Sequence, residues 1–141
     1  MRKISLTISG CMGRMGQQLI KSAYKNKNFK LVSLTENRKI SRKIFGIKPE
    51  INSINAFKKS NVIIDFTTPK CTLEILKIAA KLKKKVIIGT TGFTKKEENL
   101  IKKFSKRQKE ILEEFNELET NKPDPVIKNF FEKAKRFWKK T

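Results

Sequence analysis

The stretch ISLTISGCMGRMG, residues 4–16, decides the fold of this chain. Apolar and polar side chains alternate over residues 4–8, which predicts a strand. Three glycines follow at intervals of three, Gly10, Gly13 and Gly16, and a helical pattern of apolar residues comes next. A strand, a glycine turn and a helix in this order direct bare backbone N–H groups at a phosphate, because a helix N-terminus favours an anion.

Each glycine has its own expected role. Gly10 allows a sharp turn, Gly13 allows the backbone to approach a pyrophosphate, and Gly16 allows the helix to pack closely on the strand. The usual spacing is G-x-G-x-x-G, whereas this chain reads G-x-x-G-x-x-G. A purely structural glycine turn is therefore the alternative interpretation.

A carboxylate favours the phosphate-binding interpretation. Residues 29–34 predict a second strand, and Glu36 follows it, twenty positions beyond Gly16. Dinucleotide-binding folds place there the carboxylate that accepts hydrogen bonds from the adenosine ribose. Arg38 and Lys39 come next, where a basic side chain either meets the 2′-phosphate of NADP or is simply solvated.

Two more strands are predicted, at residues 62–66 and 86–88, with a helix between them that Thr68 caps and Pro69 begins. Thr94 and Glu97 have the spacing of a capping box, which predicts the start of another helix. Residues 37–60 are expected to form loops with a short helix near 56–59. The sequence thus predicts an α/β fold with a parallel sheet of about four strands and flanking helices. The polar loops 65–68 and 89–91 should meet the glycine turn at the carboxyl edge of the sheet. For Asp65, capping of backbone N–H groups is preferred to a catalytic role.

The net charge of +21 raises the question whether the protein binds nucleic acid. Lysine dominates over arginine, 28 to 6, and is spread along the chain, which favours a solvated surface that helps to recruit anionic ligands. No nucleic-acid partner is therefore expected. No apolar run reaches the roughly 18 residues of a membrane span, and a cytoplasmic location is expected. Cys11 and Cys71 match no metal spacing and are interpreted as reduced thiols.

Composition changes near residue 105, which divides the chain into a domain at 1–105 and a helical tail at 106–141. The last predicted helix carries one apolar stripe: Ile127, Phe130, Phe131, Ala134, Phe137 and Trp138. Such a stripe usually packs on the chain's own core. Contact with a partner, a second copy or a membrane surface is the less favoured alternative.

Three motifs in order, GCMGRMG (residues 10–16), DFTTP (65–69) and VIIGTTGF (86–93), resemble one family over about residues 1–105. It is the cofactor domain of 4-hydroxy-tetrahydrodipicolinate reductase (dihydrodipicolinate reductase). The resemblance implies a Rossmann-type domain that binds NADH or NADPH and an oxidoreductase of the lysine and diaminopimelate pathway. Its substrate would be a small cyclic imine dicarboxylate.

The resemblance also implies roles for particular residues. Residues of the glycine turn would hold the pyrophosphate: Gly10, Cys11, Met12, Gly13, Arg14 and Met15. Glu36 would hold the adenosine ribose, and Gly89, Thr90 and Thr91 would lie near the nicotinamide and substrate. Where the family often has an arginine, directly after the ribose glutamate, this chain has Asn37.

The C-terminal part departs from the family. There the family has a second domain, whose histidine-rich motif supplies a proton and whose lysine and Ser-Gly-Thr segment bind substrate. This chain contains no histidine. A truncated, frame-shifted or fused protein with impaired catalysis is therefore expected, and no catalytic residue is assigned. A non-catalytic nucleotide-binding or assembly module is the alternative.

Overall fold

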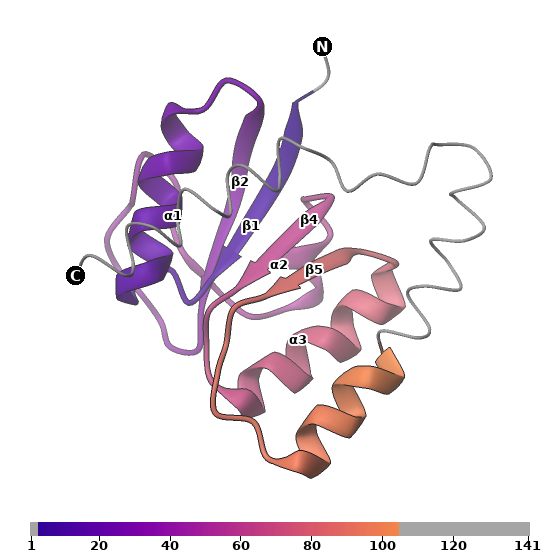
Figure 1. Ribbon diagram of the computed structural model, residues 1–141. Coiled ribbons are helices and arrows are strands. Elements are labelled where there is room, and N and C mark those ends of the chain that lie inside the picture. Colours follow the sequence, from indigo (N-terminus) through magenta and orange to yellow (C-terminus); the bar gives the residue numbers. More distant parts are fainter. Residues whose placement is uncertain (1–2, 105–141) are drawn as a thin grey trace, which may run out of the picture.

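The computed structural model describes residues 3–104, which form strands alternating with helices along the chain (Figure 1). The elements are β1 (Ile4–Ser9), α1 (Arg14–Lys25), β2 (Phe29–Glu36), β3 (Glu50–Ile51), α2 (Ile54–Phe57), β4 (Val62–Asp65), α3 (Pro69–Leu82) and β5 (Lys85–Ile88). A further helix covers residues 95–104. The predictions for residues 106–141, including the aromatic stripe, lie outside the described residues.

All five strands are parallel, in the order β3-β2-β1-β4-β5. This confirms the α/β fold. The expectation that residues 37–60 contain only loops and a short helix was wrong, because β3 lies there and pairs with the end of β2. Two residues are too few to show the alternation by which a strand is recognised in a sequence.

The short helix α2 begins two residues before its predicted position. Its start is set by Ser53, whose side chain accepts a hydrogen bond from the backbone N–H of Ala56. The caps predicted at Thr68 and Thr94 are present. Thr68 caps α3 with Pro69 in its first turn, and Thr94 and Glu97 bond each other's backbone N–H groups at the start of the final helix.

Helices cover both faces of the sheet (Figure 1). One apolar cluster packs α1 against β1, β2 and β4, and includes Leu6, Ile8, Leu19, Ile20, Leu34 and Ile64. A second cluster packs α2 and α3 against the other face, and includes Phe57, Ile63, Cys71, Ile75 and Ala79. Among the described residues, no helix is long and apolar enough to cross a membrane.

The alternation in β1 has a structural reason, although both faces of this strand are covered. Two of its polar residues are buried and hydrogen-bonded: Thr7 shares a hydrogen bond with Ser60 (2.6 Å), and the Ser9 hydroxyl donates to Asn52 (3.1 Å). Asn52 also donates to the sulfur of Cys71 on α3 (3.0 Å). These bonds tie the loop after β3 to the central strand near its carboxyl end.

Candidate functional site

The turn after β1 is built on glycine at two positions. Gly10 has φ +79°, and a Cβ there would collide with the backbone carbonyl of Phe66. A Cβ on Gly16 would collide with the carbonyl of Gly10. At Gly13, by contrast, a Cβ would lie 3.4 Å from that same oxygen, an ordinary contact, and the residue is exposed. The fold therefore requires Gly10 and Gly16, whereas Gly13 leaves an open surface.

Several backbone N–H groups of the turn donate to acceptors within the protein, whereas those at the start of the following helix do not. The N–H groups of Gly10 and Cys11 both donate to the carbonyl of Thr35 (3.0 and 3.2 Å), and that of Gly13 donates to Gly10 (3.1 Å). Helix α1 then begins at Arg14 with no side-chain cap and no acidic residue in its first turn. Because the first N–H groups of a helix have no acceptor inside it, this helix start suits an anion.

Glu36, at the end of β2, lies against the same turn. Its Oε2 accepts a hydrogen bond from the backbone N–H of Met12 (3.1 Å), and its Oε1 accepts one from its neighbour Asn37 (3.1 Å). The side chain is half-buried. The structure thus brings the predicted ribose carboxylate and the predicted phosphate turn into direct contact.

Side chains of the turn point in different directions. Cys11 and Met15 are buried in the core beneath α1, so they can meet a ligand only through their backbone, whereas Arg14 is exposed. Burial and the charge of Glu36 raise the pKa of the Cys11 thiol to about 11, and the positive charges of Arg38 and Arg42 oppose that rise. Cys11 is therefore a protonated core residue near neutral pH.

Asp65, at the end of β4, is fully buried and surrounded by threonine hydroxyls. It accepts hydrogen bonds from Thr67 (2.6 Å), Thr72 (2.5 Å) and Thr90 (3.2 Å). Burial raises the pKa of Asp65, and these hydrogen bonds partly offset the rise. Asp65 therefore holds together β4, α3 and the loop after β5 through threonine hydroxyl groups. A hydrogen bond from the backbone of Thr67 also lowers its pKa, in line with the backbone capping expected from the sequence.

The loop of residues 89–91 is fixed to the same centre. The N–H of Gly89 donates to the carbonyl of Asp65 (2.8 Å), and the Thr90 hydroxyl accepts a hydrogen bond from the N–H of Thr67 (2.9 Å). A Cβ on Gly89 would collide with the ring of Phe66. Thr90 is thus turned inward, whereas Thr91 is exposed.

All three predicted loops therefore meet at one end of the sheet. The N–H of Phe66 donates to the carbonyl of Ser9 (3.2 Å), which joins the end of β4 to the start of the glycine turn. Sequence reasoning missed two residues here. The backbone carbonyl of Phe66 lies against Gly10, and its ring lies against Gly89. Arg42 brings its Nη2 to 4.0 Å from the sulfur of Met12. Neither contact has a signal in spacing or periodicity.

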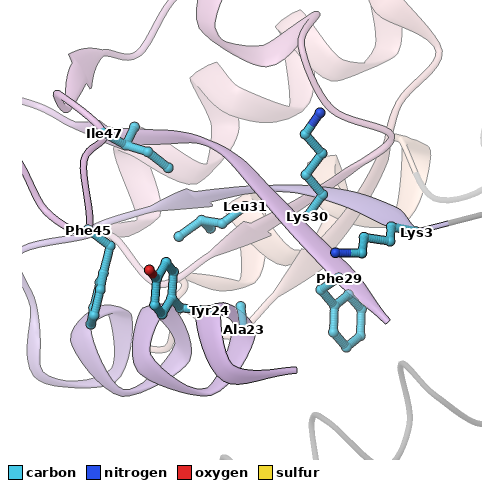
Figure 2. A pocket seen from close by; sticks show the side chains of 8 residues that line it. All are labelled: Lys3, Ala23, Tyr24, Phe29, Lys30, Leu31, Phe45 and Ile47. Carbon is cyan, nitrogen blue, oxygen red and sulfur yellow. The ribbon is translucent and has the colours of Figure 1, made fainter. Parts of the chain in front are cut away.

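A shallow pocket of about 280 Å³ lies elsewhere, beside the amino ends of β1 and β2 (Figure 2). Its lining residues are Lys3, Ala23, Tyr24, Phe29, Lys30, Leu31, Phe45 and Ile47. Tyr24 and Phe45 stack there with ring centroids 4.4 Å apart. Ligands of open α/β sheets bind at the carboxyl ends of the strands, so this pocket is not the candidate site. No cluster of side chains suited to a metal ion occurs among residues 3–104.

The strand order, the glycine turn at an uncapped helix and the carboxylate ending the next strand define a Rossmann-type domain of the class that binds NAD(P)H. The family model described as "Dihydrodipicolinate reductase, N-terminus" matches residues 4–116. The chain therefore belongs to the dihydrodipicolinate reductase family, and the matched part corresponds to the N-terminal domain.

Curated relatives agree with this assignment. The chain is 71% identical over 106 residues to the 4-hydroxy-tetrahydrodipicolinate reductase of Pelagibacter ubique (strain HTCC1062), with 75% of this chain and 41% of the relative covered. The enzyme of the same name from Buchnera aphidicola subsp. Baizongia pistaciae (strain Bp) is 39% identical over 115 residues, with coverage of 74% and 42%. The chain thus spans about two fifths of the length of these relatives.

A solved structure shares the fold. Dipicolinate-bound dihydrodipicolinate reductase from Paenisporosarcina sp. TG-14 superposes with a TM-score of 0.61 at 23% identity, over 75% of this chain and 43% of that one. A second family model, described as "Chaperone protein DnaJ C-terminal region", matches residues 107–140 only. That match is too short to assign the chain to a second family.

Proposed function

We propose that residues 10–15 and Glu36 hold the pyrophosphate and adenosine ribose of NADH or NADPH. The observation that carries this proposal is the hydrogen bond from Met12 N–H to Glu36, beside the uncapped start of α1. It means that a donor surface for phosphate and an acceptor for ribose hydroxyls adjoin each other, as a dinucleotide requires. The backbone N–H groups of Gly10 and Cys11 already donate to the carbonyl of Thr35. The donors to the pyrophosphate are therefore the backbone N–H groups of Arg14 and Met15.

The nicotinamide end of the cofactor would reach the loop of residues 89–91. Thr90 would hold that loop in place through Asp65, and the backbone of the loop together with exposed Thr91 would face the ligand. When bound, the dinucleotide supplies the hydride that the family resemblance directs to a cyclic imine dicarboxylate. The basic surface would help to attract both anions in the cytoplasm, the proposed location.

Binding, rather than turnover, is the activity that we assign to these 141 residues. The family resemblance implies a histidine-bearing proton donor, and the sequence contains no histidine. General acid catalysis contributes about 10²–10⁴-fold to a rate, so its loss alone would leave little activity. We therefore expect the chain by itself to bind the cofactor and to reduce substrate slowly or not at all.

We further propose that the chain has two parts, residues 1–105 and 106–141. The start of the second family model at residue 107 lies close to this boundary, although the first family model extends across it to residue 116. The tail, with its aromatic stripe, would then serve assembly or contact with a partner instead of substrate binding. Light scattering on the full chain and on a form ending at residue 105 tests this role, which predicts a larger species for the full chain only.

Titration of NADH fluorescence and thermal unfolding with added nucleotide test cofactor binding. For a Kd of about 10 μM, free ligand at about 100 times Kd would raise the free energy of unfolding by about 2.7 kcal/mol. NADH and NADPH should stabilise the protein, and ATP at the same concentration should do so much less. A folded sample that no dinucleotide stabilises would contradict the proposal.

A further inference from the structure

The shallow pocket at the amino ends of β1 and β2 has an aromatic wall that is largely exposed (Figure 2). Tyr24, in the last turn of α1, and Phe45, in the loop after β2, stack on each other and are 60% and 46% exposed. Ala23 and Phe29 also line the pocket and are buried. Because exposed apolar patches beside a hollow mark interaction surfaces, this pocket is a candidate docking site.

An unusual turn holds Phe45 in this position. Ile44 and Ile47 exchange two backbone hydrogen bonds (2.8 and 3.0 Å), and the residues between them, Phe45 and Gly46, have φ +47° and +79°. A two-residue turn with positive φ at both positions favours Asn-Gly, whereas a phenylalanine is disfavoured in the left-handed region. Backbone strain of this kind is concentrated at functional surfaces. Here it presents an aromatic ring to the outside.

Two lysines give the pocket a positive charge. Lys3 and Lys30 line it, and both are exposed. Between residues 3 and 104 the one ion pair joins Lys59 to Glu50, so no carboxylate of the described chain is paired with the lysines of the pocket. A partner that fits this surface therefore combines an apolar face with negative charge.

The chain itself contains such a segment, EILEEFNELE at residues 110–119. Five of its ten residues are glutamates, and none is basic. Its apolar residues include the i, i+4 and i+7 positions by which an amphipathic helix enters a groove, Ile111, Phe115 and Leu118. The aromatic stripe at residues 127–138 fits less well, because four basic residues and one acidic residue lie in that range.

The segment cannot reach the pocket of its own copy. Phe104 belongs to a helix on the side of α3 and away from α1 (Figure 1), whereas the pocket lies beside the end of α1, on the opposite face of the sheet. Helical layers on opposite faces of a sheet are about 20 Å apart, and β5 is three strands, about 14 Å, from β2. The residues 105–109 span at most about 18 Å when fully extended. A second copy is therefore the one whose pocket the segment can enter.

We propose that the acidic segment 110–119 of one copy binds the Tyr24–Phe45 pocket of a second copy, and that the exchange is reciprocal. This contact rests on the proposed role of the tail in assembly, for which it supplies the segment and the receiving surface. Phe115 enters the cavity beside Phe45, and the glutamates meet the lysines of the pocket. A two-fold pair covers both pockets, so the assembly closes at two copies.

Sedimentation velocity of the full chain over a range of concentrations measures the dissociation constant of the dimer. Phe45→Ala and Phe115→Ala should each raise this constant at least about tenfold, because each removes an aromatic anchor. Ile51→Ala is the control: it removes an apolar side chain that is 55% exposed on β3, and it should change the constant less than about twofold. Mixing the Phe45→Ala and Phe115→Ala proteins should restore part of the association, since an intact pocket then meets an intact segment.

The outcomes separate this contact from the wider role of the tail. If the full chain is a dimer that neither Phe45→Ala nor Phe115→Ala weakens, the pocket is refuted as the receiving surface, and assembly through another part of the tail stands. If the full chain is a monomer at every concentration, both proposals fail. A mixture that associates no better than either variant alone would refute the exchange between copies. Urea unfolding of each variant checks that it is folded.

Discussion

The Glu36 carboxylate accepts a hydrogen bond from the backbone N–H of Met12, 3.1 Å away and 24 positions earlier in the chain. This contact joins the end of β2 to the glycine turn. It uses one backbone donor of the turn. A bound ribose would meet the same carboxylate, so Glu36 both orders the turn and recognises the ligand in our account.

Replacement of Glu36 by alanine should weaken binding of NADH by about 1.5–3 kcal/mol, the range for hydrogen bonds to a charged group. Glu74→Ala removes an equal charge from an exposed position on α3 and serves as the control. Calorimetric titration of both variants measures the effect. An unchanged Kd in Glu36→Ala would mean that the ribose binds elsewhere.

Two of the glycines should respond in opposite ways to substitution. Gly16→Ala should destabilise the protein by about 1–3 kcal/mol, because its Cβ would collide with the carbonyl of Gly10. Gly13→Val should leave urea unfolding nearly unchanged and abolish dinucleotide binding, because its side chain fills the surface that the pyrophosphate approaches. Retained affinity in Gly13→Val would count against the phosphate turn.

Asp65 should make stability depend on pH in a defined direction. Burial raises its pKa above the ordinary value of 3.8, so the folded protein holds the proton more tightly than the unfolded chain. The stabilisation linked to this proton is complete below that ordinary value and is lost as pH rises through the folded-state pKa.

Urea unfolding of the wild type and of Asp65→Asn at several pH values from about 4 to 8 measures this linkage. Other titrating groups are common to both proteins and cancel in the difference. The wild type should lose stability relative to Asp65→Asn as pH rises. Parallel curves over the whole range would show that Asp65 has the same pKa in both states.

The two neighbouring threonines of the loop after β5 form a matched pair. Thr90→Val removes a donor to Asp65 and the acceptor of Thr67 N–H, both largely shielded from water, and should cost about 1–3 kcal/mol of stability. Thr91→Val changes an exposed position and should stay within about 0.5 kcal/mol of the wild type. Equal effects of the two substitutions would contradict the inward orientation of Thr90.

Cys11 should resist thiol reagents in the folded protein. With a pKa of about 11 and no exposed surface, it is ionised only to about one part in a thousand at pH 8. Cys71 is also buried with a raised pKa. Neither thiol should react with Ellman's reagent before urea unfolds the chain; rapid release by the native protein would contradict the packing beneath α1.

The sequence was sufficient for the features that depend on local pattern. The strand–glycine–helix order, the position of Glu36 and the caps at Thr68 and Thr94 were all predicted correctly, because each follows from spacing or from backbone chemistry. The sequence was insufficient where a contact joins distant segments. The two-residue strand β3 forms only because β2 offers an edge, which no local period reveals.

The same limit applied within the site. Asp65 was expected to cap backbone groups, but three threonine hydroxyls also bond it, and two of them come from α3 and from the loop after β5, so they could not be chosen before the topology was known. Arg42 is one of many cations in a basic chain, and only its approach to Met12 distinguishes it. Residue types indicated the chemistry of the site, whereas the fold determined which of them meet.

The most direct test of the account is residue-resolved NMR of the ¹⁵N-labelled full chain during titration with NADH. We predict the largest amide shift changes at Met12, Arg14, Met15 and Asn37, at the N-terminus of α1 and the end of β2, with little change at Tyr24 and Phe45 around the opposite pocket. Saturable changes centred on that pocket, or none at the glycine turn, would contradict the proposed binding site.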